Sequence, residues 1–221
     1  MLHIQRSSAS GNKQLARDQL LIRINGTLPD TETLGNVEKS ERAAEVKRYR
    51  INTNTSCSLF ASASEETNQI FHMLVDVGQG IVESIQKGIS ELGFNNSSSS
   101  SSPIIPDAVL ITHSHDDHIR ELPLLADKAT DKSKRLNIYS TSECRDQILS
   151  KYSQMSSIIN NNQVSFTILQ PCEYFQVGPF SVLPVLSDHG ENSSPGSVIY
   201  SKTTKSKSNN WMGFSFITQC K

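Results

Sequence analysis

The most informative stretch of this sequence is Ala108-Val109-Leu110-Ile111-Thr112-His113-Ser114-His115-Asp116-Asp117-His118. It begins as an apolar, strand-like run and ends as a cluster of imidazoles and carboxylates. Three of the six histidines in the chain fall within it. Neutral imidazole and carboxylate are ligand types that suit zinc and similar divalent metals. The stretch therefore predicts a metal site at the end of a strand.

Residues 113–118, called the hook below, have a spacing that suits metal binding. His113 and His115 are two apart on an extended segment, so both side chains can point to one side. Asp117 and His118 follow where the chain is expected to turn into a helix. The hook can thus offer four ligands over a short distance. The alternative for these residues is a polar surface loop.

Two further residues complete the predicted site. His189 follows an apolar run over residues 180–186, and a distant ligand of this kind would tie separate elements to one metal. A lone histidine at a strand end is the alternative. Asp76 also ends an apolar run and is a candidate to orient the ligands through hydrogen bonds. A helix N-cap or a turn is the alternative for Asp76.

Size and composition set broad limits on function. The 221 residues suffice for one sizeable core, and the net charge of -1 gives no general attraction to nucleic acid or anionic membranes. The longest apolar runs are too short to cross a bilayer, so no membrane partner is expected. The cysteines are scattered without a CxxC pair, at Cys57, Cys144, Cys172 and Cys220. They predict reduced thiols in a cytoplasmic protein.

The spacing of apolar residues and the positions of turn residues predict the helices and strands. We expect a mobile tail over residues 1–18 and one domain over residues 19–221, with a serine-rich insertion at 95–103. Helical spacing predicts helices over 81–92, from Asp117 or His118 past Leu125, and over 143–155, the last with a capping box at 140–143. Strands are predicted at 19–25, 57–60, 71–76, 108–112, 136–139, 164–169, 174–177, 180–186, 197–200 and 211–217.

Several motifs, in order, carry a family resemblance. The pattern His113-x-His115-x-Asp117-His118 resembles the signature of the metallo-β-lactamase-fold hydrolases. Gly26-Thr27-Leu28-Pro29 resembles the opening turn of the subgroup that contains cyclic phosphodiesterases and transfer-RNA 3′-processing endonucleases. Residues 54–59, 75–78 and 188–190 resemble its second strand, its strand with a terminal aspartate and its third metal motif.

This resemblance implies an αββα four-layer sandwich, incomplete at the C-terminus. His113, His115 and His189 would bind one metal. Asp117 and His118 would serve a second metal, or Asp117 would transfer protons if a single ion is bound. Zinc is the expected ion, as one or two ions, with manganese as an alternative. Water whose pKa the metal lowers would be the nucleophile.

The resemblance also narrows the reaction. It implies a metal-dependent hydrolase, and a cyclic or small phosphodiester is the favoured substrate because the sequence shows no strongly basic arm for nucleic acid. An RNA-processing endonuclease is the alternative, so nucleic acid stays open as a partner, and so does a homodimer. Fold alone does not imply cleavage of β-lactams.

One departure from the family pattern bears on catalysis. The family supplies a later aspartate that bridges both metals and a later histidine for the second site, but this sequence has no aspartate or histidine after His189. Either the chain is shortened or its second site is degenerate. A truncated or degenerate member that binds metal without turnover is therefore a further hypothesis.

Overall fold

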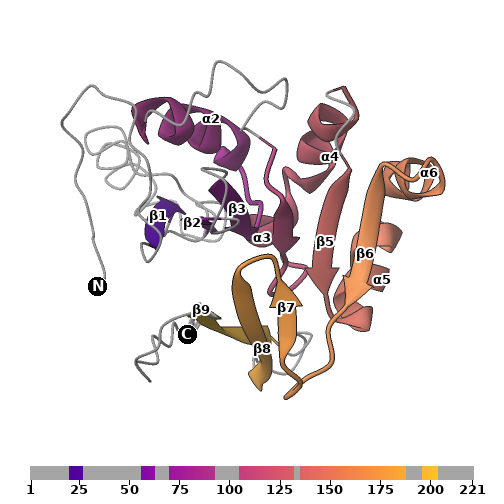
Figure 1. Ribbon diagram of the computed structural model, residues 1–221. Helices are drawn as coiled ribbons and strands as arrows, with labels where there is room; N and C mark the ends of the chain where they lie inside the picture. The colour runs from indigo at the N-terminus through magenta and orange to yellow at the C-terminus, as the bar shows by residue number, and fades with distance from the viewer. Residues whose placement is uncertain are drawn as a thin grey trace, which may run out of the picture.

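Two β-sheets pack face to face, and helices cover the other side of the larger sheet (Figure 1). The computed structural model describes residues 20–26, 56–62, 70–92, 105–131, 135–187 and 196–203. The larger sheet has the order β1 (Leu21–Gly26), β2 (Ser56–Ser62), β3 (Ile70–Val75), β4 (Ala108–Leu110), β5 (Leu136–Ser140) and β6 (Val164–Ile168). The smaller sheet has the order β7 (Phe175–Val177), β8 (Phe180–Ser187) and β9 (Gly196–Thr203).

The larger sheet changes from antiparallel to parallel pairing at β3. Strands β1, β2 and β3 pair antiparallel, whereas β3 to β6 run parallel. All three residues of β4 are buried, since this strand lies between parallel neighbours and is covered on both faces. The carboxyl ends of β3 and β4 therefore meet at one edge of the sheet.

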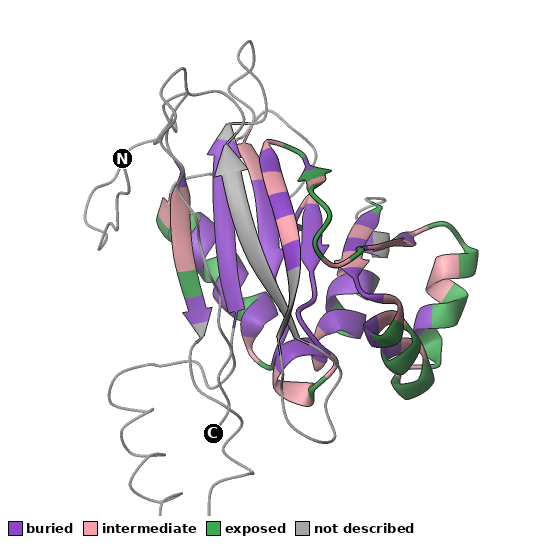
Figure 2. Cartoon of the chain, turned by 90° about the horizontal axis from the view of Figure 1, so that it is seen from below, coloured by how far each residue is buried: buried purple, intermediate pink, exposed green. Residues whose placement is uncertain are grey.

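Five helices were found in the described residues, and they pack on one face of the larger sheet. They are α2 (Ile81–Leu92), α3 (Asp116–Ile119), α4 (Leu122–Asp131), α5 (Ser142–Lys151) and α6 (Gln154–Asn160). Ile85, Leu125 and Ile148 from these helices join one core with Leu74 and Val109 of the sheet. Figure 2 shows buried residues along the strands and exposed residues on the outer helical surface.

The opposite face of the larger sheet packs against the smaller sheet. Met73 and Leu110 share a buried cluster with Phe180 and Val182 of β8. The β7–β8 hairpin turns at Gly178, whose φ of 54° is a conformation that glycine adopts without strain. Gly178 also lies directly against the Phe71 ring, where a larger residue would collide. The layering of helices, sheet and sheet confirms the predicted fold class.

The predicted helix that starts near Asp117 is wrong in one respect, because the structure divides it. Helix α3 ends at Ile119, and α4 begins at Leu122. The N–H of Glu121 donates to the carbonyl of Val77 at 3.0 Å, so it does not continue the helical hydrogen-bond ladder. A contact with a distant loop therefore interrupts the local helical pattern.

The predicted helix over 143–155 is also divided, into α5 and α6. Tyr152 ends α5 with a ψ of 82°, which lies outside the helical region. The N-cap of α5 is Thr141, whose hydroxyl accepts a hydrogen bond from the Cys144 N–H. The predicted capping box placed the cap one residue earlier, at Ser140, which instead belongs to β5.

Several predictions lie outside the described residues. These are the tail at 1–18, the turn at 27–29, the serine-rich insertion at 95–103, the motif at 188–190 and the strand at 211–217. Among the described helices, none combines the length and apolar character needed to span a membrane.

Candidate metal centre

Two loops at the carboxyl ends of β3 and β4 form the candidate site. Asp76 follows β3, and Thr112 and the hook follow β4. The N–H of Asp76 donates to the Leu110 carbonyl at 2.8 Å, and the N–H of Val77 donates to the His118 carbonyl at 2.6 Å. These backbone hydrogen bonds fix the two loops against each other, as the parallel pairing of their strands allows.

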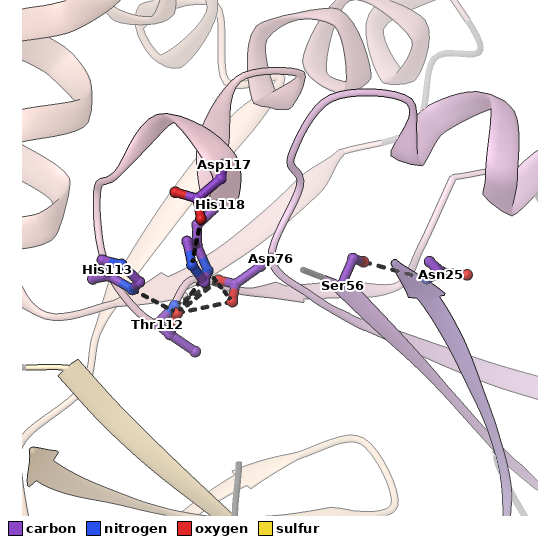
Figure 3. Close-up of polar contacts among 7 residues, drawn as sticks. All are labelled: Asn25, Ser56, Asp76, Thr112, His113, Asp117 and His118. Carbon is purple, nitrogen blue, oxygen red and sulfur yellow. Dashed lines mark hydrogen bonds and ion pairs between the residues drawn. The ribbon is translucent and has the colours of Figure 1, made fainter. Parts of the chain in front are cut away.

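The carboxylate of Asp76 is the buried centre of this arrangement (Figure 3). It accepts hydrogen bonds from the Thr112 N–H at 2.8 Å and from the Thr112 hydroxyl at 2.8 Å. The Nδ1 atom of His118 lies 2.7 Å from Asp76 Oδ2. Asp76 adopts a φ of 59°, a left-handed conformation that aspartate tolerates better than most residues. The residue is 1 % exposed, so these donors take the place of water around its carboxylate.

The hydrogen bonds assign the tautomers of two histidines. A carboxylate only accepts, so His118 Nδ1 donates to Asp76, and the neutral ring keeps a lone pair on Nε2. The single proton of the Thr112 hydroxyl points to Asp76, so His113 Nδ1, at 3.1 Å, donates to the hydroxyl oxygen. The Nε2 atoms of both histidines are thus the ones able to bind a metal.

The structure brings the four predicted ligands of the hook together. The ring centroids of His113 and His118 are 3.9 Å apart, and those of His113 and His115 are 4.6 Å apart. Asp117 Oδ2 lies 3.5 Å from His118 Nε2. His113 and His118 are buried, Asp117 is half-buried and His115 is exposed.

The buried carboxylate of Asp76 changes the pKa of the neighbouring His118. Burial alone would lower the pKa of His118, but the charge of Asp76, its hydrogen bond and the charge of Asp117 outweigh burial, and the pKa is raised. Asp116 behaves differently, since its hydrogen bond to Lys151 lowers its pKa against the opposing effect of burial, with Lys151 and Arg120 adding their charges.

Two thiols lie in the cores on either face of the larger sheet. Burial, followed by the negative charge of Asp76, raises the pKa of both Cys57 and Cys144 to about 12. Both cysteines are free, as is the exposed Cys172. Thiols with such pKa values stay protonated near neutral pH and are poor nucleophiles.

Sequence reasoning missed Thr112 and Glu121. Thr112 joins Asp76 to His113, and a threonine at a strand end gives no sequence signal of that role. The Glu121 carboxylate accepts hydrogen bonds from the N–H groups of Gly80 at 2.6 Å and Val82 at 2.9 Å, at the start of α2. Glu121 thereby fixes the loop that carries Asp76.

A second group of buried polar side chains lies on the same sheet but apart from the hook. Asn25 Nδ2 donates to the hydroxyls of Ser56 at 3.2 Å and Ser58 at 2.9 Å. Figure 3 shows Asn25 and Ser56 as a pair separate from the histidines. These residues satisfy one another between β1 and β2 and do not contribute to the candidate metal site.

The donor set fits a divalent metal. Imidazole nitrogens whose other ring nitrogen is hydrogen-bonded, together with a nearby carboxylate, form a common metal-binding arrangement. Within the described ranges, however, no three candidate ligands form a ready-made metal cage. The distant candidate, His189, lies outside those ranges. The metal site predicted from the sequence would therefore need a ligand in addition to those of the hook.

Solved structures show the same fold. The metallo-beta-lactamase fold protein YhfI from Bacillus subtilis aligns with a TM-score of 0.54 and 14% identity, over 84% of this chain and 59% of its own. A diphosphatase from the PhnP family aligns with a TM-score of 0.55 and 14% identity, over 83% of this chain and 62% of its own. Human tRNase Z, short form, aligns with a TM-score of 0.52 and 15% identity, over 83% of this chain and 64% of its own.

These alignments span less than two thirds of each solved protein. No curated protein matches the sequence. The family model described as the beta-lactamase superfamily domain matches residues 92–221, which is more than half of the chain and includes the hook. This chain therefore belongs to the beta-lactamase superfamily, and its fold is the metallo-β-lactamase fold.

Proposed function

We propose that the chain is a metal-dependent phosphodiesterase that acts on a small or cyclic phosphodiester. The observation that carries this proposal is the arrangement of His113, His118 and Asp117. Nδ1 of each histidine is hydrogen-bonded to Thr112 or Asp76, so each ring presents Nε2 as its candidate metal-binding atom, and Asp117 Oδ2 lies 3.5 Å from that atom of His118.

We assign His113, His115 and His189 to one zinc ion. Asp117 and His118 serve a second ion, or Asp117 moves a proton when one ion is bound, and manganese is the alternative metal. A bound metal supplies a Lewis acid that lowers the pKa of water and stabilises charge on a phosphoryl oxygen. Asp76 and Thr112 hold the imidazoles in the required tautomer, and their burial excludes water from those hydrogen bonds.

The phosphodiester class is supported by the names of the solved relatives. Two are called a diphosphatase and a tRNase, which are enzymes of phosphate-containing substrates. The net charge of -1 favours a small substrate over a long RNA, since RNA binding depends strongly on positive charge. We place the protein in the cytoplasm, in agreement with the free thiols of the described cysteines.

The test is hydrolysis of bis(p-nitrophenyl) phosphate by the purified chain with zinc or manganese. His115→Ala removes an exposed candidate ligand, so the protein should remain folded while activity falls at least about a hundredfold, more than is typical for outer hydrogen-bond partners. His3→Ala is the matched control, since it makes the same change in the predicted tail. Equal rates for wild type and His115→Ala would overturn the proposal.

Assays with RNA and with a cyclic nucleotide distinguish a phosphodiesterase of small substrates from an endonuclease and from a non-catalytic protein. Cleavage of a structured RNA with a steep salt dependence, and no turnover of small diesters, would favour the endonuclease hypothesis. Zinc binding without turnover of either substrate would favour a non-catalytic member. Turnover of a cyclic nucleotide that His115→Ala abolishes is the result we expect.

A further inference from the structure

The hook has two residues that are not predicted ligands, Ser114 and Asp116. They alternate with the histidines at 113 and 115, and side chains alternate between the two sides of an extended segment. His115 is extended, with a φ of -68° and a ψ of 151°. Ser114 thus lies on the opposite side of the extended segment from the two histidines, and Asp116 follows as the first residue of α3.

Both side chains contact one helix, α5. The Ser114 hydroxyl donates to Gln147 Oε1, and the Asp116 carboxylate forms an ion pair with Lys151 Nζ. Gln147 and Lys151 are four residues apart and therefore lie on the same face of α5. One helical face thus holds the hook at two alternate positions.

Helix α5 is well suited to serve as a fixed support. Cys144 and Ile148 are buried in the main core, and the Thr141 hydroxyl accepts a hydrogen bond from the Cys144 N–H at 3.3 Å. The helix therefore cannot shift without disturbing core packing. Its two contacts with the hook transmit that fixed position to the ligand loop.

Asp116 is also held from the opposite side, by Arg120. Arg120 NH2 lies 3.7 Å from Asp116 Oδ2, and Arg120 NH1 donates to Gln79 Oε1 at 2.9 Å. Asp116 and Arg120 together therefore connect α5 to the turn before α2. The hook is thus held against α5 on one side and the turn before α2 on the other. The side chains that make these contacts are not candidate ligands.

We propose that Gln147 and Lys151 are positioning residues, which set the orientation of His115 and Asp117 for metal binding by holding Ser114 and Asp116. This inference rests on the proposed metal-dependent function. His113 and His118 are already fixed by Thr112 and Asp76. The α5 contacts act on His115 and Asp117, the more exposed candidate ligands. The direction of the backbone at these two residues decides where their side chains point.

The experiment measures zinc affinity by competition with a chromophoric chelator, and ligand geometry by the visible spectrum of the cobalt form. The Gln147→Ala/Lys151→Met variant should bind zinc about tenfold more weakly, the low end of the usual effect of a supporting residue. Its cobalt bands should shift. Its Tm should change by less than about 4 °C, because exposed contacts add little stability.

Two controls isolate the position of the charge. Arg145→Met removes a cation from the same helix, but Arg145 pairs with Asp146 and not with the hook, so zinc affinity should stay unchanged. Lys151→Arg keeps a cation that can reach Asp116 and should restore most of the affinity. A loss of affinity in Arg145→Met equal to that in Lys151→Met would overturn the inference.

A double-mutant cycle tests the route through Asp116. If Lys151 acts through Asp116, the variant Asp116→Asn/Lys151→Met should bind zinc as weakly as Asp116→Asn alone. Additive losses would overturn this route. Wild-type affinity in every α5 variant would overturn the inference and leave the proposed function intact. Failure of the wild type to bind zinc or cobalt would overturn both.

Discussion

The two sides of the hook are held by different kinds of interaction. On the inner side, Asp76 and Thr112 are buried, and they accept hydrogen bonds from His118 at 2.7 Å and from His113 at 3.1 Å. On the outer side, Asp116 and Lys151 form an ion pair in which each side chain is 42% exposed. Both sides involve a carboxylate and a partner that donates to it. Because water weakens electrostatic interactions, the exposed pair on the outer side is weaker than the buried hydrogen bonds on the inner side.

The two sides of the hook should therefore contribute differently to the stability of the fold and to the geometry of the candidate site. The inner hydrogen bonds join two strands, and breaking them leaves buried polar groups without partners, which destabilises the fold. The outer contacts can be lost to water with little effect on folding. The inner side should therefore control whether the site exists, and the outer side should control how well it binds.

The largest expected effect follows from Asp76→Ala. This change leaves the N–H and hydroxyl of Thr112 and Nδ1 of His118 without their buried acceptor. The free energy of unfolding should fall by at least about 3 kcal/mol, since each buried donor left without an acceptor costs about 1–3 kcal/mol. Urea denaturation of the metal-free protein measures the change.

Asp127→Ala is the matched control, since Asp127 is exposed on α4. Its effect should stay within about 0.5 kcal/mol. Asp76→Asn should lie between the two, because asparagine tolerates the left-handed conformation but cannot supply the negative charge. A loss below about 1 kcal/mol in Asp76→Ala would contradict the inner side's predicted role.

The sequence predicted the layers of the fold because burial decides them. The apolar runs of β3 and β4 and the helical spacing of α2 follow directly from which side chains enter the core. It failed at the boundary between α3 and α4, where the Glu121 N–H bonds to Val77. That hydrogen bond joins residues far apart in the chain, and no local pattern indicates it.

The candidate ligands of the hook lie near one another because they are neighbours in the chain, and their binding of a metal stays a prediction. Asp76 was predicted to orient ligands, and the structure places it against His118, although its role in metal binding stays a prediction. Thr112 and Lys151 could not be predicted, since their contacts depend on the packing of β3 and α5. His189 lies outside the described residues, so its contribution remains a prediction as well.

The second expected effect is a loss of stability at alkaline pH, which tests the buried surroundings of Asp76. The pKa of Cys57 and Cys144 is about 12 in the folded chain, above the ordinary cysteine value of 9.0. Above about pH 9 the unfolded chain releases thiol protons that the folded chain keeps, so stability falls as pH rises. At about pH 10 the loss should reach about 1.4 kcal/mol for each thiol.

Guanidinium denaturation at about pH 8 and about pH 10 measures this loss. The Cys57→Ala/Cys144→Ala variant should show a much smaller difference between the two pH values. Burial also raises the pKa of Tyr139 and Tyr152, so part of the alkaline loss should persist. An unchanged pH dependence in the variant would show that the thiols do not ionise on unfolding as the structure requires.

The smallest expected effect is on the outer side. Lys151→Met should lower the free energy of unfolding by less than about 1 kcal/mol at low salt, because the ion pair with Asp116 is exposed. In about 1 M salt the screening length falls to about 3 Å, and the difference from wild type should vanish. The loss caused by Asp76→Ala should persist in the same salt, because its hydrogen bonds are buried.

Urea denaturation at both salt concentrations gives the comparison. If salt reduced both losses equally, the two sides of the hook would be equally exposed to solvent in solution, and the division between stability and geometry would be wrong.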